Sequence, residues 1–271
     1  MLQNLIFPER AAPRLSVVIP ARNEAENIVA LVEAIDAALV LESPFEIIVV
    51  DDASTDDSLA RLSALAARLP HLVVLSHDMR GGQSAAVHTG VQAARGPIVL
   101  TLDGDGQNPP GELPKLAAPL LADRDGTIGL VAGQRVGRKD TLSKRLASRF
   151  ANGIRARVLA DGTRDTGCGL KGFRRDAFLA LPYFDHMHRY LPALFSRDGW
   201  RVVHVDVTHR PRVAGRSNYS NLQRGLVGIV DLAAVAWLIR RRKKARGAVI
   251  ASTGTASQVQ PRAINSPEPA L

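Results

Sequence analysis

Short apolar runs alternate with amphipathic segments along the N-terminal part of the chain. Four of these runs are continuous and carry β-branched residues, at 15–20, 46–50, 72–75 and 98–102. Runs of that length and composition predict buried strands. Between them, apolar residues recur at helical spacing, as at Ile28, Leu31, Val32, Ile35 and Leu39. Continuous strands joined by helices predict an α/β fold, with a mainly parallel sheet flanked by helices on both faces.

Polar residues and glycines mark where the predicted helices begin. Asn23 is placed to cap the first helix, with Glu26 three residues later as in a capping box. Ser54 or Thr55 is placed to cap the second helix. A turn at Gly81-Gly82 predicts the start of a third. Each of these helices would therefore begin shortly after a strand, as in a βα repeat.

The pattern is looser beyond Leu130. A basic stretch runs from Arg135 to Arg157, a further strand is predicted over 201–207, and an apolar segment at 225–239 precedes a run of basic residues. The tail from residue 245 is rich in Ala, Ser, Pro and Gln, which is typical of disorder. We expect an N-terminal extension over 1–13, one globular domain over 14–220, an amphipathic helix with a basic end over 221–244, and a disordered tail over 245–271.

Composition narrows the class of protein. With 271 residues, 46% of them hydrophobic, the chain can bury one sizeable core. The single cysteine, Cys168, excludes an internal disulfide and a cysteine-based structural zinc site, and it fits a reducing compartment. The net charge of +9 favours anionic partners, which include nucleic acid, acidic lipid headgroups and phosphorylated small molecules. Charge alone does not separate these partners from a role in solubility.

The apolar segment at 225–239 bears on membrane contact. It is shorter than the roughly 18–20 residues needed to span a bilayer, and it contains Asp231. An interfacial helix on anionic lipid fits its spacing and its basic end, whereas a helix packed on the core, or in an oligomer contact, fits the same pattern. The N-terminal residues lack the charged start and apolar run of a signal peptide. We favour the interfacial helix, which predicts a peripheral or shallowly inserted protein at the cytoplasmic face of the membrane.

Acidic residues follow two of the predicted strands, at the edge where parallel sheets bind ligands. Asp103-Gly104-Asp105 follows the fourth strand, and carboxylates at this spacing suit Mg²⁺ or Mn²⁺. Such an ion leaves coordination sites for diphosphate oxygens. Asp51 and Asp52 end the second strand, where burying two acids requires a cation or donor groups. The alternatives are a turn with solvated aspartates at 103–105 and helix capping at 54–56.

Three motifs, in this order, resemble family 2 glycosyltransferases of the GT-A (Rossmann-like) fold. Pro20-Ala21-Arg22-Asn23-Glu24 is similar to the family's Pro-x-Tyr-Asn-Glu opening, with Arg22 where the family has an aromatic residue. Val50-Asp51-Asp52-x-Ser54-x-Asp56 matches its second signature. Asp103-Gly104-Asp105-x-Gln107-x-Pro109-Pro110 matches its metal-binding motif. Each motif alone is weak evidence, whereas three in order on a βα pattern are specific.

Within that family the chain resembles polyprenyl-phosphate sugar transferases of the dolichol-phosphate mannosyltransferase type. Gly133-Gln134-Arg135 looks like their Gly-Ser-Arg, and 165–173 resembles their Asp-x-x-Ser-Gly-Phe region. The segment 210–219 resembles their Arg…Gly-x-Ser-Lys, with Asn218 where the family often has lysine. The resemblance implies an inverting, metal-dependent transfer of a sugar from a GDP- or UDP-sugar to a polyprenyl phosphate, with Mg²⁺ or Mn²⁺ as the cofactor.

The resemblance also implies roles for individual residues. The nucleoside pocket would be lined by Pro20, Arg22, Glu24, Val50 and Asp52. The donor diphosphate and metal would be held by Asp103, Gly104, Asp105 and Gln107, with Asp103, Asp105 and Gln107 as the metal ligands. The catalytic residues would be Asp105, Asp103 and Arg135. The lipid phosphate would meet Arg135, Arg145, Arg149 and Asp165, and the donor diphosphate would be clamped by Arg210 and Arg212.

Two other residue types invite chemistry that we set aside. His186 and His188 are two residues apart with no third ligand beside them, so we expect them to shape the acceptor site rather than bind a metal. Cys168 lies between glycines without an activating partner in the sequence, which favours a tight loop over a nucleophile.

Two rival functions fit parts of the pattern. A sugar nucleotidyltransferase would share an α/β fold and Mg²⁺, but it needs a Gly-rich phosphate loop where this chain has 20–24. A non-catalytic basic module for nucleic acid or lipid would leave the acids at the strand ends unexplained, and the chain has few aromatic rings for base stacking. We therefore expect a nucleotide-sugar donor, a polyprenyl-phosphate acceptor and a membrane surface as partners, and no nucleic acid. A transferase for another cell-envelope glycan or lipid acceptor is the alternative.

Overall fold

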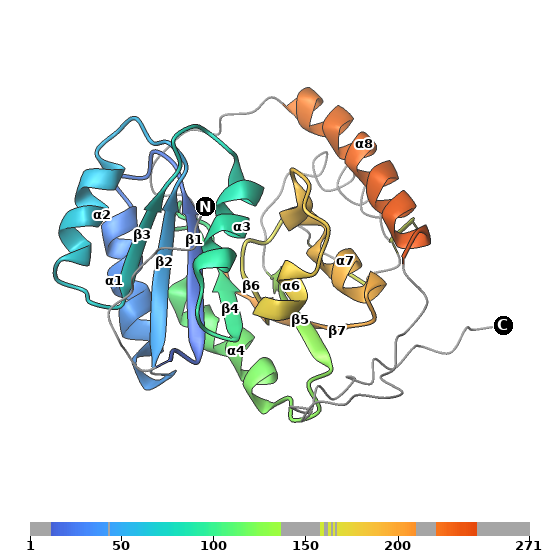
Figure 1. The fold of residues 1–271 in the computed structure, drawn as a ribbon, viewed down its shortest axis with the longest axis horizontal. Helices are drawn as coiled ribbons and strands as arrows, with labels where there is room; N and C mark the ends of the chain where they lie inside the picture. The colour runs from blue at the N-terminus through green and yellow to red at the C-terminus, as the bar shows by residue number, and fades with distance from the viewer. Residues whose placement is uncertain are drawn as a thin grey trace, which may run out of the picture.

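The computed structural model describes residues 12–42, 44–136, 158–159, 162–163, 165, 167–209 and 221–242. These residues form an α/β structure around a seven-stranded sheet (Figure 1). The strands are β1 (Leu15–Ala21), β2 (Phe45–Asp51), β3 (Leu72–Ser76), β4 (Ile98–Thr101), β5 (Ile128–Arg135), β6 (Lys171–Arg174) and β7 (Arg201–Val207). The predicted disordered tail and most of the basic stretch after Arg135 lie outside the described residues.

Helices cover both faces of the sheet, as predicted. They are α1 (Ile28–Leu39), α2 (Ser58–Ala66), α3 (Gln83–Ala93), α4 (Leu113–Ala122), α6 (Arg175–Leu179), α7 (Leu191–Arg197) and α8 (Asn221–Arg240), with 3₁₀ turns η1 (Val40–Glu42), η2 (Pro110–Glu112) and η3 (Met187–Arg189). One apolar cluster joins the sheet to α1, α2 and α4, and a second joins it to α3, α6 and α7. Successive residues of β1 serve different clusters: Val17 faces the first and Val18 the second. This two-sided burial explains why the strands read as continuous apolar runs.

The sheet runs in the order β3-β2-β1-β4-β6-β5-β7. The half that contains β1 to β4 is parallel, and its four strands are those predicted from the apolar runs. β6 lies antiparallel between β4 and β5, and β7 pairs parallel with β5. The sequence did not predict β5 and β6. The reason is clearest in β6, which is four residues long and contains Lys171 and Gly172 instead of an apolar run.

The predicted helix caps at Asn23, Ser54 and Thr55 are wrong. α1 begins at Ile28 and α2 at Ser58, several residues further on. Asn23 has φ 56°, and its side-chain oxygen accepts a hydrogen bond from the Thr55 backbone N–H at 2.8 Å. The Ser54 hydroxyl in turn accepts the Asn23 backbone N–H at 2.9 Å. These polar side chains therefore join the loops after β1 and β2 to each other, and do not cap helices.

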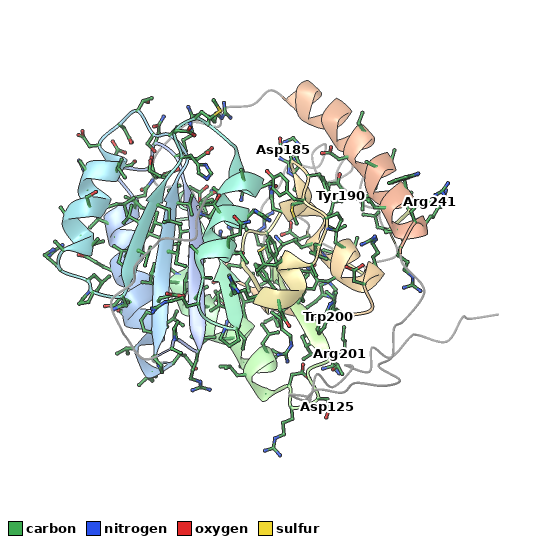
Figure 2. The ribbon with its side chains drawn as sticks, in the orientation of Figure 1. Asp125, Asp185, Tyr190, Trp200, Arg201 and Arg241 are labelled. Atoms are coloured by element: carbon green, nitrogen blue, oxygen red, sulfur yellow. The ribbon has the colours of Figure 1, made fainter. Side chains whose placement is uncertain are left out.

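α8 packs on the protein through one of its faces, beside α7 (Figure 1). Val235 is fully buried in the second apolar cluster. Tyr190, labelled in Figure 2, donates from its hydroxyl to the Gly228 carbonyl oxygen at 3.3 Å. Val230 and Trp237 are 68% and 58% exposed. The packed-helix alternative therefore holds for one face of α8, while another face presents apolar side chains outward. Among the described residues, no helix is long and apolar enough to cross a bilayer.

Candidate functional site

The loops after β1, β2 and β4 meet at one edge of the sheet. The Asp52 backbone N–H donates to the Ala21 carbonyl oxygen at 2.8 Å, which ties the end of β2 to the end of β1. Gly104 lies so close to β1 that an added Cβ would be 3.1 Å from the Pro20 carbonyl oxygen. The three sequence motifs therefore come together, as the parallel topology predicted.

Asp103 is a partly buried carboxylate two residues after the end of β4. Its Oδ1 accepts from the Gln83 side-chain amide at 2.8 Å, and its Oδ2 accepts from the Asn108 amide at 3.2 Å. Burial, followed by the charge of Asp105, raises the pKa of Asp103. Asp105 accepts the Gln107 backbone N–H at 3.1 Å. Two acids are thus held close together, in an arrangement that a cation would stabilise.

The donor chemistry of this pair fits a hard divalent cation. Carboxylate oxygens are the ligands that Mg²⁺ and Mn²⁺ prefer. Among the described residues no group of three or more His, Cys, Asp or Glu side chains is arranged for a metal ion. An ion at Asp103 and Asp105 would therefore complete its coordination shell with water and with oxygens of a bound ligand. On one side Gly169 lies directly against Asp103, because a Cβ on Gly169 would lie 2.3 Å from Asp103 Oδ2.

Asp52 is held by donors from its own chain. It accepts hydrogen bonds from His77 Nδ1 at 2.7 Å and from the backbone N–H groups of Gly81 and Gly82 at 2.7 and 2.8 Å. Burial acts to raise the pKa of Asp52, but these hydrogen bonds outweigh it and lower that pKa. The neighbouring Asp51 is buried and accepts from the Ser54 backbone N–H, while its Oδ1 has no hydrogen-bond partner in the described part of the chain. In this structure Asp52 anchors the loop that leads into α3.

The remaining residues assigned to the nucleoside pocket differ in burial and in their partners. Pro20 lines the pocket described below. Arg22 is at the same edge, and its Nε is buried without a hydrogen-bond partner among the described residues. Glu24 accepts from the Asn27 side-chain amide at 3.0 Å. Val50 is fully buried, and a Cβ on Gly90 of α3 would lie 3.2 Å from it. The Val50 side chain therefore packs in the core, and its assignment to the nucleoside pocket stays a prediction.

Arg135 and Asp165 form a two-point ion pair. Arg135 Nε and Nη2 donate to the two carboxylate oxygens of Asp165 at 2.5 and 2.8 Å. The hydrogen bond to Asp165 raises the pKa of Arg135, so its charge is fixed. The Asp165 backbone N–H donates to the Gln134 side-chain oxygen at 2.9 Å. The structure thus brings together two residues assigned to the acceptor. The other four assigned arginines, Arg145, Arg149, Arg210 and Arg212, lie outside the described residues.

A pocket of roughly 570 Å³ opens beside Asp103. Its lining comes from the ends of β1 and β4, the start of α3, the loop at 167–169, β6, η3 and α7. Two of its residues, Lys171 and His188, are far in the sequence from Pro20 and Gln83, which line the same pocket. Sequence reasoning expected His188 near an acceptor site but gave Lys171 no role. The available signal for Lys171 was a lysine among apolar residues and glycines at 168–173.

Comparison with known proteins identifies the family. The family described as glycosyl transferase family 2 matches residues 16–181, and the chain belongs to it. The undecaprenyl-phosphate 4-deoxy-4-formamido-L-arabinose transferase of Pectobacterium carotovorum is 36% identical over 212 residues, covering 77% of this chain and 63% of that protein. The protein of the same description from Yersinia enterocolitica is 35% identical over 210 residues, covering 76% and 63%. The chain thus spans about 63% of the length of these curated relatives.

Solved structures confirm the predicted GT-A fold. Glucosyl-3-phosphoglycerate synthase from Mycobacterium tuberculosis, in complex with Mn²⁺, UDP-glucose and phosphoglyceric acid, superposes with a TM-score of 0.65 at 22% identity. That likeness covers 84% of this chain and 79% of the other. A mannosyltransferase from Pyrobaculum calidifontis, in complex with GDP-mannose and Mn²⁺, gives a TM-score of 0.59 at 25% identity and covers 86% and 66%.

Proposed function

We propose that the chain is an inverting glycosyltransferase that moves a sugar from a GDP- or UDP-sugar to a polyprenyl phosphate, with Mg²⁺ or Mn²⁺ at Asp103 and Asp105. The observation that carries this proposal is the position of that acidic pair, at the edge where the ends of β1, β2 and β4 meet. The named activity of the curated relatives supports a lipid-phosphate acceptor. The Mn²⁺ and nucleotide-sugar complexes of the structural neighbours support a metal-dependent donor site.

The transfer is a single displacement. An oxygen of the lipid phosphate forms a bond to the anomeric carbon, while the bond from that carbon to the donor diphosphate breaks and its electrons leave with the nucleoside diphosphate. The bound cation supplies charge stabilisation on that leaving group. A phosphate monoester is largely ionised near neutral pH, because its second pKa is about 6, and it needs no strong general base. The protein's own contribution is positioning and charge compensation.

Several described residues are suited to that contribution. Gln83 and Asn108 hold the Asp103 carboxylate through its two oxygens, which fixes the direction in which it faces the ligand. The Arg135–Asp165 pair is rigid because it is bidentate, and it provides a fixed cation near Asp103. A donor diphosphate bound at the acidic pair would therefore meet a preorganised site.

The direct test replaces Asp105 with alanine. We expect Asp105→Ala to lose most transfer of labelled sugar into the organic phase, and to lose thermal stabilisation by UDP or GDP with Mn²⁺. The matched control is Asp125→Ala, an exposed aspartate on the loop between α4 and β5 (Figure 2). An Asp105→Ala protein that keeps wild-type turnover would overturn the metal assignment. Transfer to a water-soluble glycan but not to polyprenyl phosphate would overturn the acceptor assignment.

We further propose that the outer face of α8 rests on the cytoplasmic face of the membrane. Val230 and Trp237 are exposed on this helix. Three basic residues lie at its end, Arg240, Arg241 and Arg242, of which Arg241 is labelled in Figure 2. Apolar and basic side chains in this order suit an interface with anionic lipid. We expect Trp237→Ser to reduce cosedimentation with phosphatidylglycerol vesicles, and Leu41→Ser, at a 94% exposed leucine in η1, to leave it unchanged. Equal binding by both variants would refute the proposal.

A further inference from the structure

Lys171 is a buried lysine that lines the pocket beside Asp103 and, among the described residues, forms no ion pair with a carboxylate. It is the first residue of β6 and is only 6% exposed. Its ammonium group donates to the Cys168 carbonyl oxygen, which uses one of three N–H donors. Asp103 and Asp165 act on Lys171 electrostatically, but within the described part of the chain neither forms an ion pair with its nitrogen. Its two other N–H donors have no partner among the described residues, and at the wall of a pocket they can bind an anionic ligand.

His188 supplies a second donor to the same pocket. Its Nδ1 lies 2.7 Å from the hydroxyl of Ser84, a buried residue of α3. The same hydroxyl accepts the His188 backbone N–H at 3.4 Å. A hydroxyl that accepts this N–H can donate its own hydrogen to Nδ1, which leaves the ring proton on Nε2. Among the described residues Nε2 has no partner, so the imidazole is free to donate to a ligand.

Lys171 and His188 lie on the side of the site away from β1 and β2, the strands assigned to the nucleoside. β1 and β2 lie on one side of β4, and β6, which carries Lys171, lies on the other. The acidic pair at the end of β4 lies between them. Gln83, which holds Asp103, directly precedes Ser84, which holds His188, so α3 positions both groups. A donor with its base over β1 and β2 and its diphosphate at the acidic pair would leave Lys171 and His188 on the side from which a nucleophile approaches.

We propose that Lys171 and His188 form the subsite that binds the phosphate monoester of the acceptor. This inference rests on the proposed function and identifies where its nucleophile binds. Lys171 supplies charge and two N–H donors, and His188 Nε2 supplies a neutral donor. A phosphate group can accept all three, since each of its oxygens accepts hydrogen bonds. Both residues act by binding and orienting the attacking oxygen.

The test separates acceptor from donor recognition. Lys171→Met removes the charge and keeps most of the side-chain volume, and Lys115→Met on the outer surface of α4 is the matched control. For Lys171→Met we expect the KM for a short polyprenyl phosphate to rise about 10- to 100-fold, as the loss of charge-assisted hydrogen bonds predicts. The donor KM and the Kd of UDP or GDP with Mn²⁺ should change less than about twofold. A parallel loss of donor affinity would show that the cation serves the donor diphosphate, and no change in acceptor KM would refute the subsite.

Two further measurements guard against misfolding and against failure of the proposed function. His188→Leu should raise the acceptor KM. His188→Gln keeps a side-chain N–H donor, so its acceptor KM should lie between those of His188→Leu and the wild type. Equal KM values for the two variants would contradict the donor role. Calorimetric binding of the short polyprenyl phosphate, with the corresponding alcohol as the control, needs no turnover. Phosphate-dependent binding that Lys171→Met abolishes supports the subsite even if the wild type transfers no sugar. Equal binding of the phosphate and the alcohol would overturn it.

Discussion

Replacing Asp52 with asparagine tests whether this carboxylate anchors the loop before α3. The wild-type carboxylate accepts three hydrogen bonds, from His77 and from two backbone amides. An asparagine oxygen can take the place of Oδ1, but its NH₂ group would then face the Gly82 N–H and could not accept it. The hydrogen bonds that remain would have a neutral acceptor in place of a charged one. Since a hydrogen bond to a charged group is worth about 1.5–3 kcal/mol, we expect the free energy of unfolding to fall by about 2–4 kcal/mol.

The pH dependence of that loss follows from the lowered pKa of Asp52. A carboxyl whose folded-state pKa lies below its ordinary value of 3.8 stabilises the protein above that value. The contribution is lost as the pH falls through the folded-state pKa. The stability difference between wild type and Asp52→Asn should therefore be full at pH 7 and should shrink as the pH falls below 3.8.

Urea unfolding followed by circular dichroism at several pH values provides the assay. The control is Asp57→Asn, because Asp57 is exposed, precedes α2, and makes no side-chain cap hydrogen bond. We expect the control to change stability by less than about 0.5 kcal/mol. A loss of similar size in both variants, or a difference for Asp52→Asn that stays constant on acidification, would refute the reasoning.

Two further changes test the close approach at the site and the support at the opposite end of the sheet. Gly169→Ala should abolish thermal stabilisation by nucleoside diphosphate with Mn²⁺, because the new Cβ would lie 2.3 Å from an Asp103 oxygen. Gly111→Ala is the control and should keep that stabilisation, because a Cβ there would have no atom within 4 Å. Retained stabilisation in Gly169→Ala would contradict the close packing of Gly169 on Asp103. Glu46→Gln should cost about 2–4 kcal/mol in urea unfolding, since Glu46 is buried and its Oε2 accepts from Arg95 Nε at 2.9 Å. A cost under about 0.5 kcal/mol would mean that this pair adds no stability.

The first half of the fold could be predicted because its information is local. The runs that became β1 to β4 are short, continuous and flanked by helical spacing, and burial on both faces requires that pattern. The same patterning placed Asp52 and Asp103 at strand ends, and parallel topology then required those ends to share an edge. The acidic edge of the site was therefore available from the sequence.

Which side chains at that edge are free for a ligand depended on contacts between distant segments. Asp52 is engaged by Gly81 and Gly82, whose backbone amides carry no signature in the sequence. Only the loop conformation brings them to the carboxylate. The predicted caps failed for the same reason, because Asn23 found partners across the site instead of along its own helix.

The acceptor side of the site was decided by tertiary structure. β6 is too short and too polar to predict, yet its insertion beside β4 brings the Gly169 carbonyl oxygen within 2.9 Å of the Thr101 hydroxyl, 68 residues away. His188 meets Ser84 across 104 residues. Sequence patterning specified the strands and the acids at their ends, since hydrophobic periodicity is local. That Lys171 lies beside β4 and His188 beside α3, around one pocket, is a property of the folded chain, because only packing brings such distant segments into contact.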